Sequence, residues 1–195
     1  AVDAGDPEEV CSMVYTSGTT GPPKGAMINH RNIEAMTAAT AEAIEATASD
    51  SVVSYLPLCH VAERIFSLFL PMYLGCTVNF AESISTIQDD LREIGPTVFL
   101  GVPRIWEKLQ SSIVIKIKDS AAYKRWLFDR CLSVGHRMAD KRLSGEHVGP
   151  GQKLAWLTAY GLMLRALQNF VGLRKARFCF SAAAPISPDV LRFFH

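Results

Sequence analysis

The chain of 195 residues is 49% hydrophobic and 20% charged, which supplies enough apolar material for one globular domain or a large piece of one. Its 13 glycines and 10 prolines are too few for a fibrous or low-complexity protein. The first residues are acidic and polar, unlike a secretory signal, and Arg165 interrupts the longest apolar stretch. The five cysteines are far apart and form no C-x-x-C pair, so we expect buried, reduced thiols in a cytosolic protein.

The net charge is +1, but the two halves of the sequence differ in sign. Residues 1–103 hold 4 Lys and Arg against 13 Asp and Glu, whereas residues 104–195 hold 16 against 6. A basic half suits an anionic ligand or a lipid surface. We favour the simpler interpretation that the halves neutralise each other, because charge asymmetry alone is weak support for a ligand. We expect no nucleic acid as a partner.

The predicted elements alternate between strands and helices along the chain. Residues 11–16 form a strand that enters a glycine-rich turn, and residues 25–28 form the second arm of that turn. A helix begins at Asn29 or His30 and continues to about residue 48. It is followed by a strand over residues 51–56, a buried helix over residues 61–74 and a strand over residues 77–81.

The second half continues the alternation. A helix over residues 83–94 ends at Gly95 and Pro96, and a strand over residues 97–102 follows. Next come a helix from Pro103, a long basic helix over residues 121–143, a helix with apolar faces over residues 152–173, a strand over residues 175–181, a turn over residues 183–187 and a last helix from Pro188. Strands separated by helices of this length predict an α/β fold, with a mostly parallel sheet flanked by helices.

The segment Y-T-S-G-T-T-G-P-P-K-G over residues 15–25 carries the strongest chemical signal. Its glycines let the backbone wrap N–H groups around phosphate oxygens. Its four hydroxyl side chains can donate to phosphate or ligate magnesium, for which Thr16 is our candidate. Lys24 supplies positive charge for a triphosphate. This is not a Walker A loop, because Pro23 and Gly25 stand where that loop has Gly and Ser or Thr.

The segment resembles the phosphate loop of the adenylate-forming superfamily, which includes acyl-CoA synthetases, luciferases and the adenylation domains of peptide synthetases. The resemblance implies two steps: a carboxylic acid and ATP give an acyl-adenylate and pyrophosphate, and a thiol, usually that of coenzyme A, then displaces AMP. It also implies that the loop holds the β- and γ-phosphates of ATP, with magnesium. The residues assigned to these phosphates are Thr16, Ser17, Gly18, Thr19, Thr20, Gly21 and Lys24.

Two further segments resemble long-chain acyl-CoA synthetases. L-P-L-C-H-V-A-E-R over residues 56–64 is similar to the family's L-P-L-x-H segment, which implies a place near the acyl pocket for His60. Taken alone, such a histidine is more often a helix cap or a packed residue. V-P-R-I-W-E-K over residues 102–108 resembles another family segment. There Trp106 falls where some members place an aromatic gate to the fatty-acid tunnel, with ordinary helix packing as an equal alternative.

S-A-A-A-P-I-S over residues 181–187 is similar to the family's turn along the adenine, so Ala182, Ala183 and Ala184 are assigned to the base. The sequence departs from the family here, since Ala182 and Ala183 stand where glycines are common. An alanine disfavours positive φ. The adenine contact therefore depends on whether this turn keeps its backbone conformation.

The family's Y-G-x-T-E segment, its ribose-binding aspartate and the lysine of its small C-terminal domain are not found in this sequence. We therefore expect residues 1–195 to be a partial AMP-binding domain, an incomplete piece of the large domain of a long-chain fatty acid–CoA ligase, inactive by itself. In the parent, the partners are fatty acid, ATP and coenzyme A.

Three alternatives stay open within this interpretation. In the first alternative, the parent is a fatty acyl-AMP ligase or a synthetase for another chain length. The chain is a non-catalytic binding or scaffold module. Finally, a basic helix face makes peripheral contact with a membrane, against the simpler interpretation of an ordinary solvated helix. That face comprises Lys116, Lys118, Lys124, Arg125 and Arg130.

Overall fold

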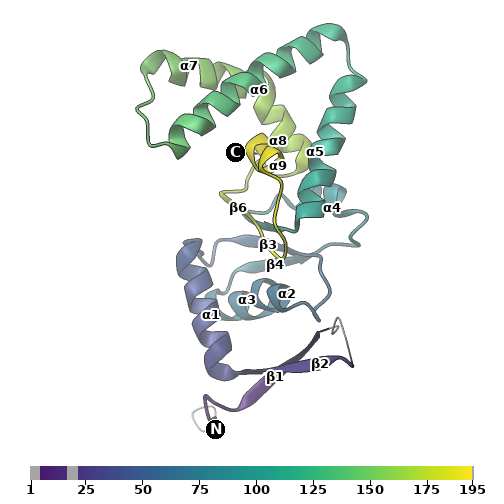
Figure 1. Ribbon diagram of the computed structural model, residues 1–195, viewed down its shortest axis with the longest axis vertical. Coiled ribbons are helices and arrows are strands. Elements are labelled where there is room, and N and C mark those ends of the chain that lie inside the picture. Colours follow the sequence, from purple (N-terminus) through teal and green to yellow (C-terminus); the bar gives the residue numbers. More distant parts are fainter. Residues whose placement is uncertain (1–4, 17–21, 195) are drawn as a thin grey trace. The chain divides into compact units, whose positions relative to one another are not determined.

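The computed structural model describes residues 5–16 and 22–194 of the chain (Figure 1). The chain forms two compact units, and each is described by itself. Unit 1 comprises residues 1–87 and 96–98, and unit 2 comprises residues 88–95 and 99–195. No helix in the described part of either unit has the length and hydropathy needed to cross a bilayer.

Unit 1 begins with an antiparallel hairpin of β1 (Val10–Thr16) and β2 (Lys24–Asn29). The pairing starts at Val10 and Asn29 and ends with Thr16 opposite Lys24, with one irregularity near the start of β1. The sequence predicted both arms of this glycine-rich turn. Because the pair is antiparallel, the hairpin is distinct from the parallel strands that follow.

Helix α1 (His30–Ala43) follows β2 directly, and Asn29 is its N-cap. The Asn29 side chain accepts from the Asn32 N–H at 2.8 Å, and the Asn32 side chain accepts from the Asn29 N–H at 3.3 Å. This reciprocal capping satisfies two donors that would otherwise lack partners. The predicted start is confirmed, but the helix ends earlier than predicted because Glu45 adopts a left-handed conformation with φ of 47°.

A βαβ arrangement completes unit 1. Strands β3 (Ser51–Ser54) and β4 (Thr77–Phe80) pair in parallel, with Ser51 opposite Thr77. The helix between them has three parts: α2 (Val61–Arg64), a π-helical turn η2 (Ile65–Phe69) and α3 (Leu70–Leu74). The Leu70 N–H reaches the Ile65 carbonyl across the π turn. The widened turn directly precedes Pro71, which lacks an N–H for the regular helical ladder.

Unit 2 is built around β5 (Val98–Gly101), which enters it after Val98, is buried at every residue and pairs with β6 (Phe178–Ser181). Before β5 lies α4 (Ile87–Ile94), which begins four residues later than predicted. Ser83 and Thr86 explain the delay: the Ser83 hydroxyl accepts from the Thr86 N–H at 3.2 Å, and the Thr86 hydroxyl accepts from the Ser83 N–H at 3.0 Å. Such side-chain bonds compete with helix formation.

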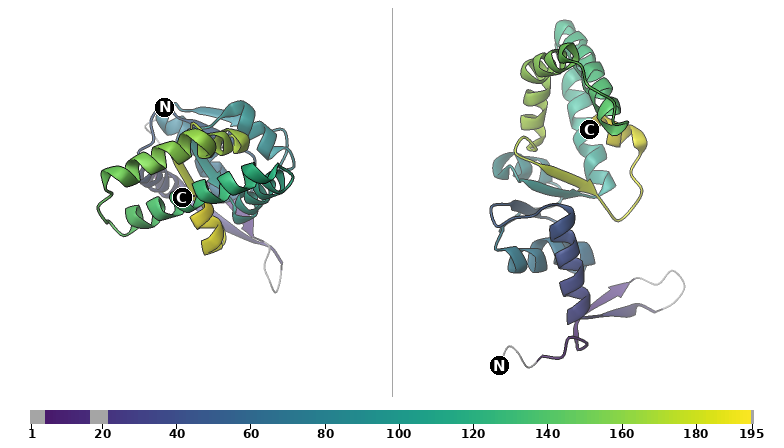
Figure 2. Two further views of the ribbon diagram at one scale, coloured as in Figure 1. Left: turned by 90° about the horizontal axis from the view of Figure 1, so that it is seen from above. Right: turned by 90° about the vertical axis from the view of Figure 1, so that its left-hand side faces the viewer.

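The remaining helices of unit 2 form a bundle beside β5 and β6. They are α5 (Pro103–Lys118), α6 (Ala122–Leu143), α7 (Pro150–Ala159), the π turn η3 (Tyr160–Leu164), α8 (Arg165–Val171) and α9 (Pro188–Phe194). Helices α6 and α7 lie side by side (Figure 2). Phe170 of α8 joins three helices, because Arg92 and Lys116 lie over its ring at 4.2 and 4.0 Å.

The prediction of buried thiols was wrong for three of the five cysteines. All five are free, and only Cys76 and Cys131 are buried; Cys11, Cys59 and Cys179 are exposed. Burial raises the pKa of the Cys76 and Cys131 thiols. The number and spacing of the cysteines in the sequence do not determine which of them become buried.

Gly172 after α8 provides a test of the packing in unit 2. Its φ is +81°, and an added Cβ would overlap the backbone of Leu91 and Arg92. We therefore expect Gly172→Ala to lower the free energy of unfolding by about 2–4 kcal/mol, measured by urea denaturation. The matched control is Gly161→Ala in η3, where an added Cβ meets nothing within 4 Å. Equal stability of the two variants would contradict the packing described for α4 and α8.

Candidate active site

The β1–β2 hairpin positions the two ends of the glycine-rich segment. Thr16 is the last residue of β1 and Lys24 the first of β2, and they are cross-strand partners. The predicted phosphate-binding residues between them, Ser17, Gly18, Thr19, Thr20 and Gly21, lie outside the described residues. The described strands therefore fix where the segment leaves the sheet and where it returns. Lys24 is exposed at the returning end.

His60 is the N-cap of α2, which is the structural role that the sequence offered as the simpler alternative. Its Nδ1 accepts a hydrogen bond from the Ala62 N–H at 3.3 Å, and the side chain is half-buried. Since Nδ1 uses its lone pair for this bond, the neutral ring carries its proton on Nε2. The cap fixes the ring and leaves an N–H donor at its other nitrogen.

The two residues that end α2 were not assigned roles from the sequence. Glu63 is 2% exposed, and its Oε1 accepts from the Ser67 hydroxyl at 2.6 Å. Arg64 turns the other way: its Nε donates to the Leu58 carbonyl at 2.6 Å, and its Nη1 donates to the Ser12 hydroxyl and to the Met13 carbonyl. The guanidinium therefore joins the His60 segment to β1.

Trp106 lies on the first turns of α5 and is 4% exposed. Its indole Nε1 donates to the Gly101 carbonyl at 3.0 Å, which ties the helix back to the end of β5. Its ring packs against Phe99 at 5.3 Å and Phe194 at 5.1 Å between centroids. An added Cβ at Gly101 would lie 2.6 Å from the indole Cε2, so this glycine makes room for the ring. Packing is thus a role that Trp106 has in this structure.

The alanine turn after β6 keeps a conformation that normally favours glycine. Ala183 has a φ of 76°, in the left-handed region, whereas Ala182 does not have a positive φ. An L-residue in this region costs about 1–2 kcal/mol. The turn has therefore kept the backbone conformation that its sequence disfavours, and Ala183 bears the conformational cost.

Trp106 lines a cavity inside unit 2 together with Ser181 and Ile186 of the segment over residues 181–187, whereas Ala182, Ala183 and Ala184 are not among its lining residues. Its volume is about 380 Å³, and Trp106, Cys179 and Ser181 line it together with apolar side chains of α8 and α9. Apolar surroundings raise the pKa of the Cys179 thiol to about 11, although the residue is exposed, so the thiol is protonated at neutral pH. The Ser181 hydroxyl is buried, and in the described residues it has no hydrogen-bond partner. A mainly apolar cavity with few polar groups suits a small organic ligand.

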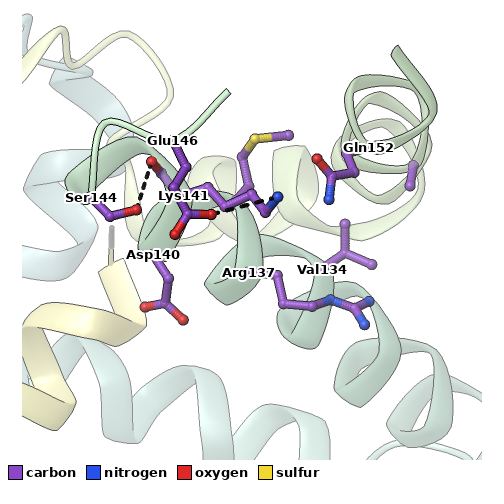
Figure 3. A pocket seen from close by; sticks show the side chains of 9 residues that line it. Val134, Arg137, Asp140, Lys141, Ser144, Glu146 and Gln152 are labelled. Atoms are coloured by element: carbon purple, nitrogen blue, oxygen red, sulfur yellow. Dashed lines mark hydrogen bonds and ion pairs between the residues drawn. The ribbon is translucent and has the colours of Figure 1, made fainter. Parts of the chain in front are cut away.

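A larger cavity of about 570 Å³ lies between α6 and α7 (Figure 3). It contains none of the residues that the sequence assigned to a site, and its charges are largely matched locally. Lys141 pairs with Glu146 at 3.7 Å, and Asp140 pairs with Arg192. The candidate residues of unit 1 lie on the hairpin and the His60 segment, and Trp106 of unit 2 lines the smaller cavity. The residues that line the larger one are Val134, Arg137, Met138, Asp140, Lys141, Ser144, Glu146, Gln152 and Ala155.

Similar proteins define the class to which this fold belongs. The adenylation domain of a carboxylate reductase from Mycobacterium chelonae superposes over 97% of this chain and 25% of its own, with a TM-score of 0.60 and 25% identity. The fold is therefore that of an adenylate-forming domain. The chain belongs to the family of AMP-binding enzymes, which matches residues 1–195.

The curated relatives are considerably longer than this chain. It is 36% identical over 200 residues to the long-chain-fatty-acid–CoA ligase ACSBG2 of Gallus gallus, covering 99% of this chain and 26% of that protein. It is 34% identical over 188 residues to the peroxisomal long chain acyl-CoA synthetase 6 of Arabidopsis thaliana, covering 96% of this chain and 25% of that protein. The chain thus spans about a quarter of the length of these relatives.

The left-handed alanine leads to a direct stability test of the turn. We expect Ala183→Gly to raise the free energy of unfolding by about 1 kcal/mol, because glycine removes the conformational cost. The matched control is Ala182→Gly, which should lower it by about 0.5–1 kcal/mol, because there glycine only adds freedom to the unfolded chain. Urea denaturation followed by tryptophan fluorescence measures both. A stabilising effect at position 182 with none at position 183 would contradict the turn conformation.

Proposed function

We propose that this chain is the central part of the AMP-binding domain of a longer ATP-dependent long-chain fatty acid–CoA ligase. The observation that carries the proposal is the glycine-rich segment over residues 15–25, held at both ends by the antiparallel pair of Thr16 and Lys24. The family match and relatives that bear the name of long-chain fatty acid–CoA ligases support it. We assign the activity to the whole protein and expect the 195 residues alone to be inactive.

The reaction proceeds in two balanced steps. A carboxylate oxygen of the fatty acid attacks the α-phosphorus of ATP, a new phosphorus–oxygen bond forms, and pyrophosphate leaves with the electrons of the broken bond. The thiol sulfur of coenzyme A then attacks the acyl carbon and loses its proton, and AMP leaves. Charge accumulates on the departing pyrophosphate in the first step, so donors positioned around the β- and γ-phosphates accelerate it.

Each candidate residue has a place in this scheme. The backbone N–H groups and hydroxyls of residues 16–21 hold the phosphates, and Lys24 offsets the charge of the leaving pyrophosphate. His60, fixed as a helix cap, offers its Nε2–H near the acid. Trp106 gates the acyl chain in addition to packing α5. Ala182, Ala183 and Ala184 lie along the adenine.

Magnesium is the metal ion that the proposed reaction requires with ATP. Residues 5–16 and 22–194 contain no group of three or more His, Cys, Asp or Glu side chains that could hold a metal. Magnesium keeps several waters and takes most of its other ligands from substrate phosphates. Thr16 is the protein ligand we propose, and when bound the ion neutralises phosphate charge.

An exchange assay on the full-length protein tests the proposed function. We expect fatty-acid-dependent exchange of labelled pyrophosphate into ATP, strongest with long-chain acids. We expect Lys24→Met to lower kcat/KM for ATP about 100-fold, because a charge opposite the leaving group is lost. The matched control is Lys153→Met on α7, outside the proposed site, which should keep full activity. Absence of exchange with every fatty acid would refute the proposal.

The same exchange reaction separates the alternatives. A fatty acyl-AMP ligase would exchange pyrophosphate but form no coenzyme A thioester, and a synthetase for another chain length would peak with shorter or longer acids. A scaffold module would neither exchange pyrophosphate nor bind ATP.

We also propose peripheral contact between the α5–α6 corner and an anionic membrane. Tyr123 and Trp126, one helical turn apart on α6, are 67% and 61% exposed, and Arg130 lies over the Trp126 ring at 5.5 Å. Exposed aromatic rings beside basic side chains suit the headgroup region of a bilayer. The Arg125 guanidinium donates to the Lys118 and Ser120 carbonyls at 3.1 Å, and these neutral acceptors do not cancel its positive charge.

Sedimentation of the full-length protein with vesicles tests this contact. We expect binding to phosphatidylserine vesicles at low salt, loss of most of it in the variant Tyr123→Ser/Trp126→Ser, and little binding to phosphatidylcholine. The matched control is Leu154→Ser/Leu157→Ser, which removes two exposed apolar side chains from α7. Equal loss in both double variants would reject the corner as the contact.

A further inference from the structure

Arg64 connects two segments that lie far apart in the sequence. Its Nε donates to the Leu58 carbonyl at 2.6 Å, within the segment that carries His60. Its Nη1 donates to the Ser12 hydroxyl, 52 residues away, and to the Met13 carbonyl at 3.4 Å. One side chain thus contacts the His60 segment (residues 56–64) and β1, the strand that leads into the glycine-rich segment.

The contacts of Arg64 lie in the two segments that carry the proposed phosphate-binding residues and His60. Ser12 and Met13 are paired with Ile28 and Met27 of β2, so they belong to the part of the hairpin that supports the Thr16–Lys24 pair. The backbone N–H of Arg64 also donates to the His60 carbonyl at 3.3 Å, within the first turn of α2. Any shift of α2 relative to β1 would therefore break contacts of the same side chain.

The geometry requires an arginine rather than any cation. The guanidinium is planar and presents its donors in fixed, divergent directions, so Nε and Nη1 reach different segments at once. A lysine has one compact ammonium and cannot reproduce both directions. Arg64 is half-buried, and the acceptors are two carbonyls and a hydroxyl, so no carboxylate partner is needed to explain its position.

We infer that Arg64 is a positioning residue that holds β1 at a fixed position relative to the His60 segment. In the proposed reaction this would align the phosphates of ATP with the carboxylate of the acid. This inference rests on the proposed function for its effect on rate. Arg64 touches neither substrate and acts through β1 and the segment over residues 56–64. Loss of alignment lowers the rate of adenylate formation without removing a reacting group.

The test uses the full-length protein and pyrophosphate exchange. We expect Arg64→Ala and Arg64→Lys to lower kcat roughly 10- to 100-fold while the KM for the fatty acid changes less than about twofold. Ser12→Ala should lower kcat on its own and cause no further loss in the Arg64→Ala background, because both act through one contact. The matched control is Arg31→Ala, which removes the exposed Arg31–Glu8 ion pair of unit 1 and should leave kcat unchanged.

Amide hydrogen exchange provides a readout that does not depend on activity. We expect faster exchange in β1 and β2 of Arg64→Ala than in wild type, and no change in Arg31→Ala. Unchanged exchange in the hairpin overturns the inference about Arg64, whether or not the protein is a ligase. If the wild type is inactive and Arg64→Ala still exchanges faster, the proposed function is refuted, but the structural role of Arg64 in holding β1 to the His60 segment is supported. Wild-type kcat in Arg64→Lys shows that charge alone suffices and also overturns the inference.

Discussion

A loop that gathers N–H groups around phosphate must have its ends fixed, because glycine-rich backbone loses more conformational entropy on ordering than any other. The antiparallel pairing of Thr16 with Lys24 meets this requirement. It determines where the segment leaves and re-enters the sheet, and it places the lysine at the exit. The capped start of α1 extends the same constraint, since Asn29 both ends β2 and caps the helix. Everything proposed about ATP depends on this pair.

Much of the fold could be predicted because local signals were strong and agreed with one another. The Asn29 cap, Pro103 at the start of α5 and Pro188 at the start of α9 all mark helix ends in the sequence, and the structure places helix ends there. The late start of α4 and the early end of α1 were missed. The first depends on hydroxyl bonds at Ser83 and the second on the left-handed conformation of Glu45, and helix propensity indicates neither.

The candidate site shows a different limit of sequence reasoning. The types of residue were recognisable from their motifs, but the contacts that orient them join segments far apart in sequence. Cap formation by His60 was anticipated, whereas the tie from Trp106 to the Gly101 carbonyl was not, since an indole beside a glycine has no spacing signature. The departure at Ala183 had a visible signal, because an alanine where glycine is common raises the question of positive φ.

Glu63 and Arg64 show how one short helix serves the core and the site together. Successive residues on a helix point about 100° apart, so two neighbouring charges can face different surroundings. Glu63 enters the core of unit 1 and bonds Ser67, one turn on, while Arg64 reaches out to β1. The Ser67 hydroxyl gives the buried Glu63 side chain a hydrogen-bond partner, and that bond helps to hold the helix in one rotation about its axis. With that rotation fixed, the guanidinium of Arg64 reaches Ser12, and its bond to the Leu58 carbonyl helps to hold it there. The buried residue thus orients the helix, and the half-buried Arg64 passes that orientation on to β1, the strand that leads into the proposed phosphate loop.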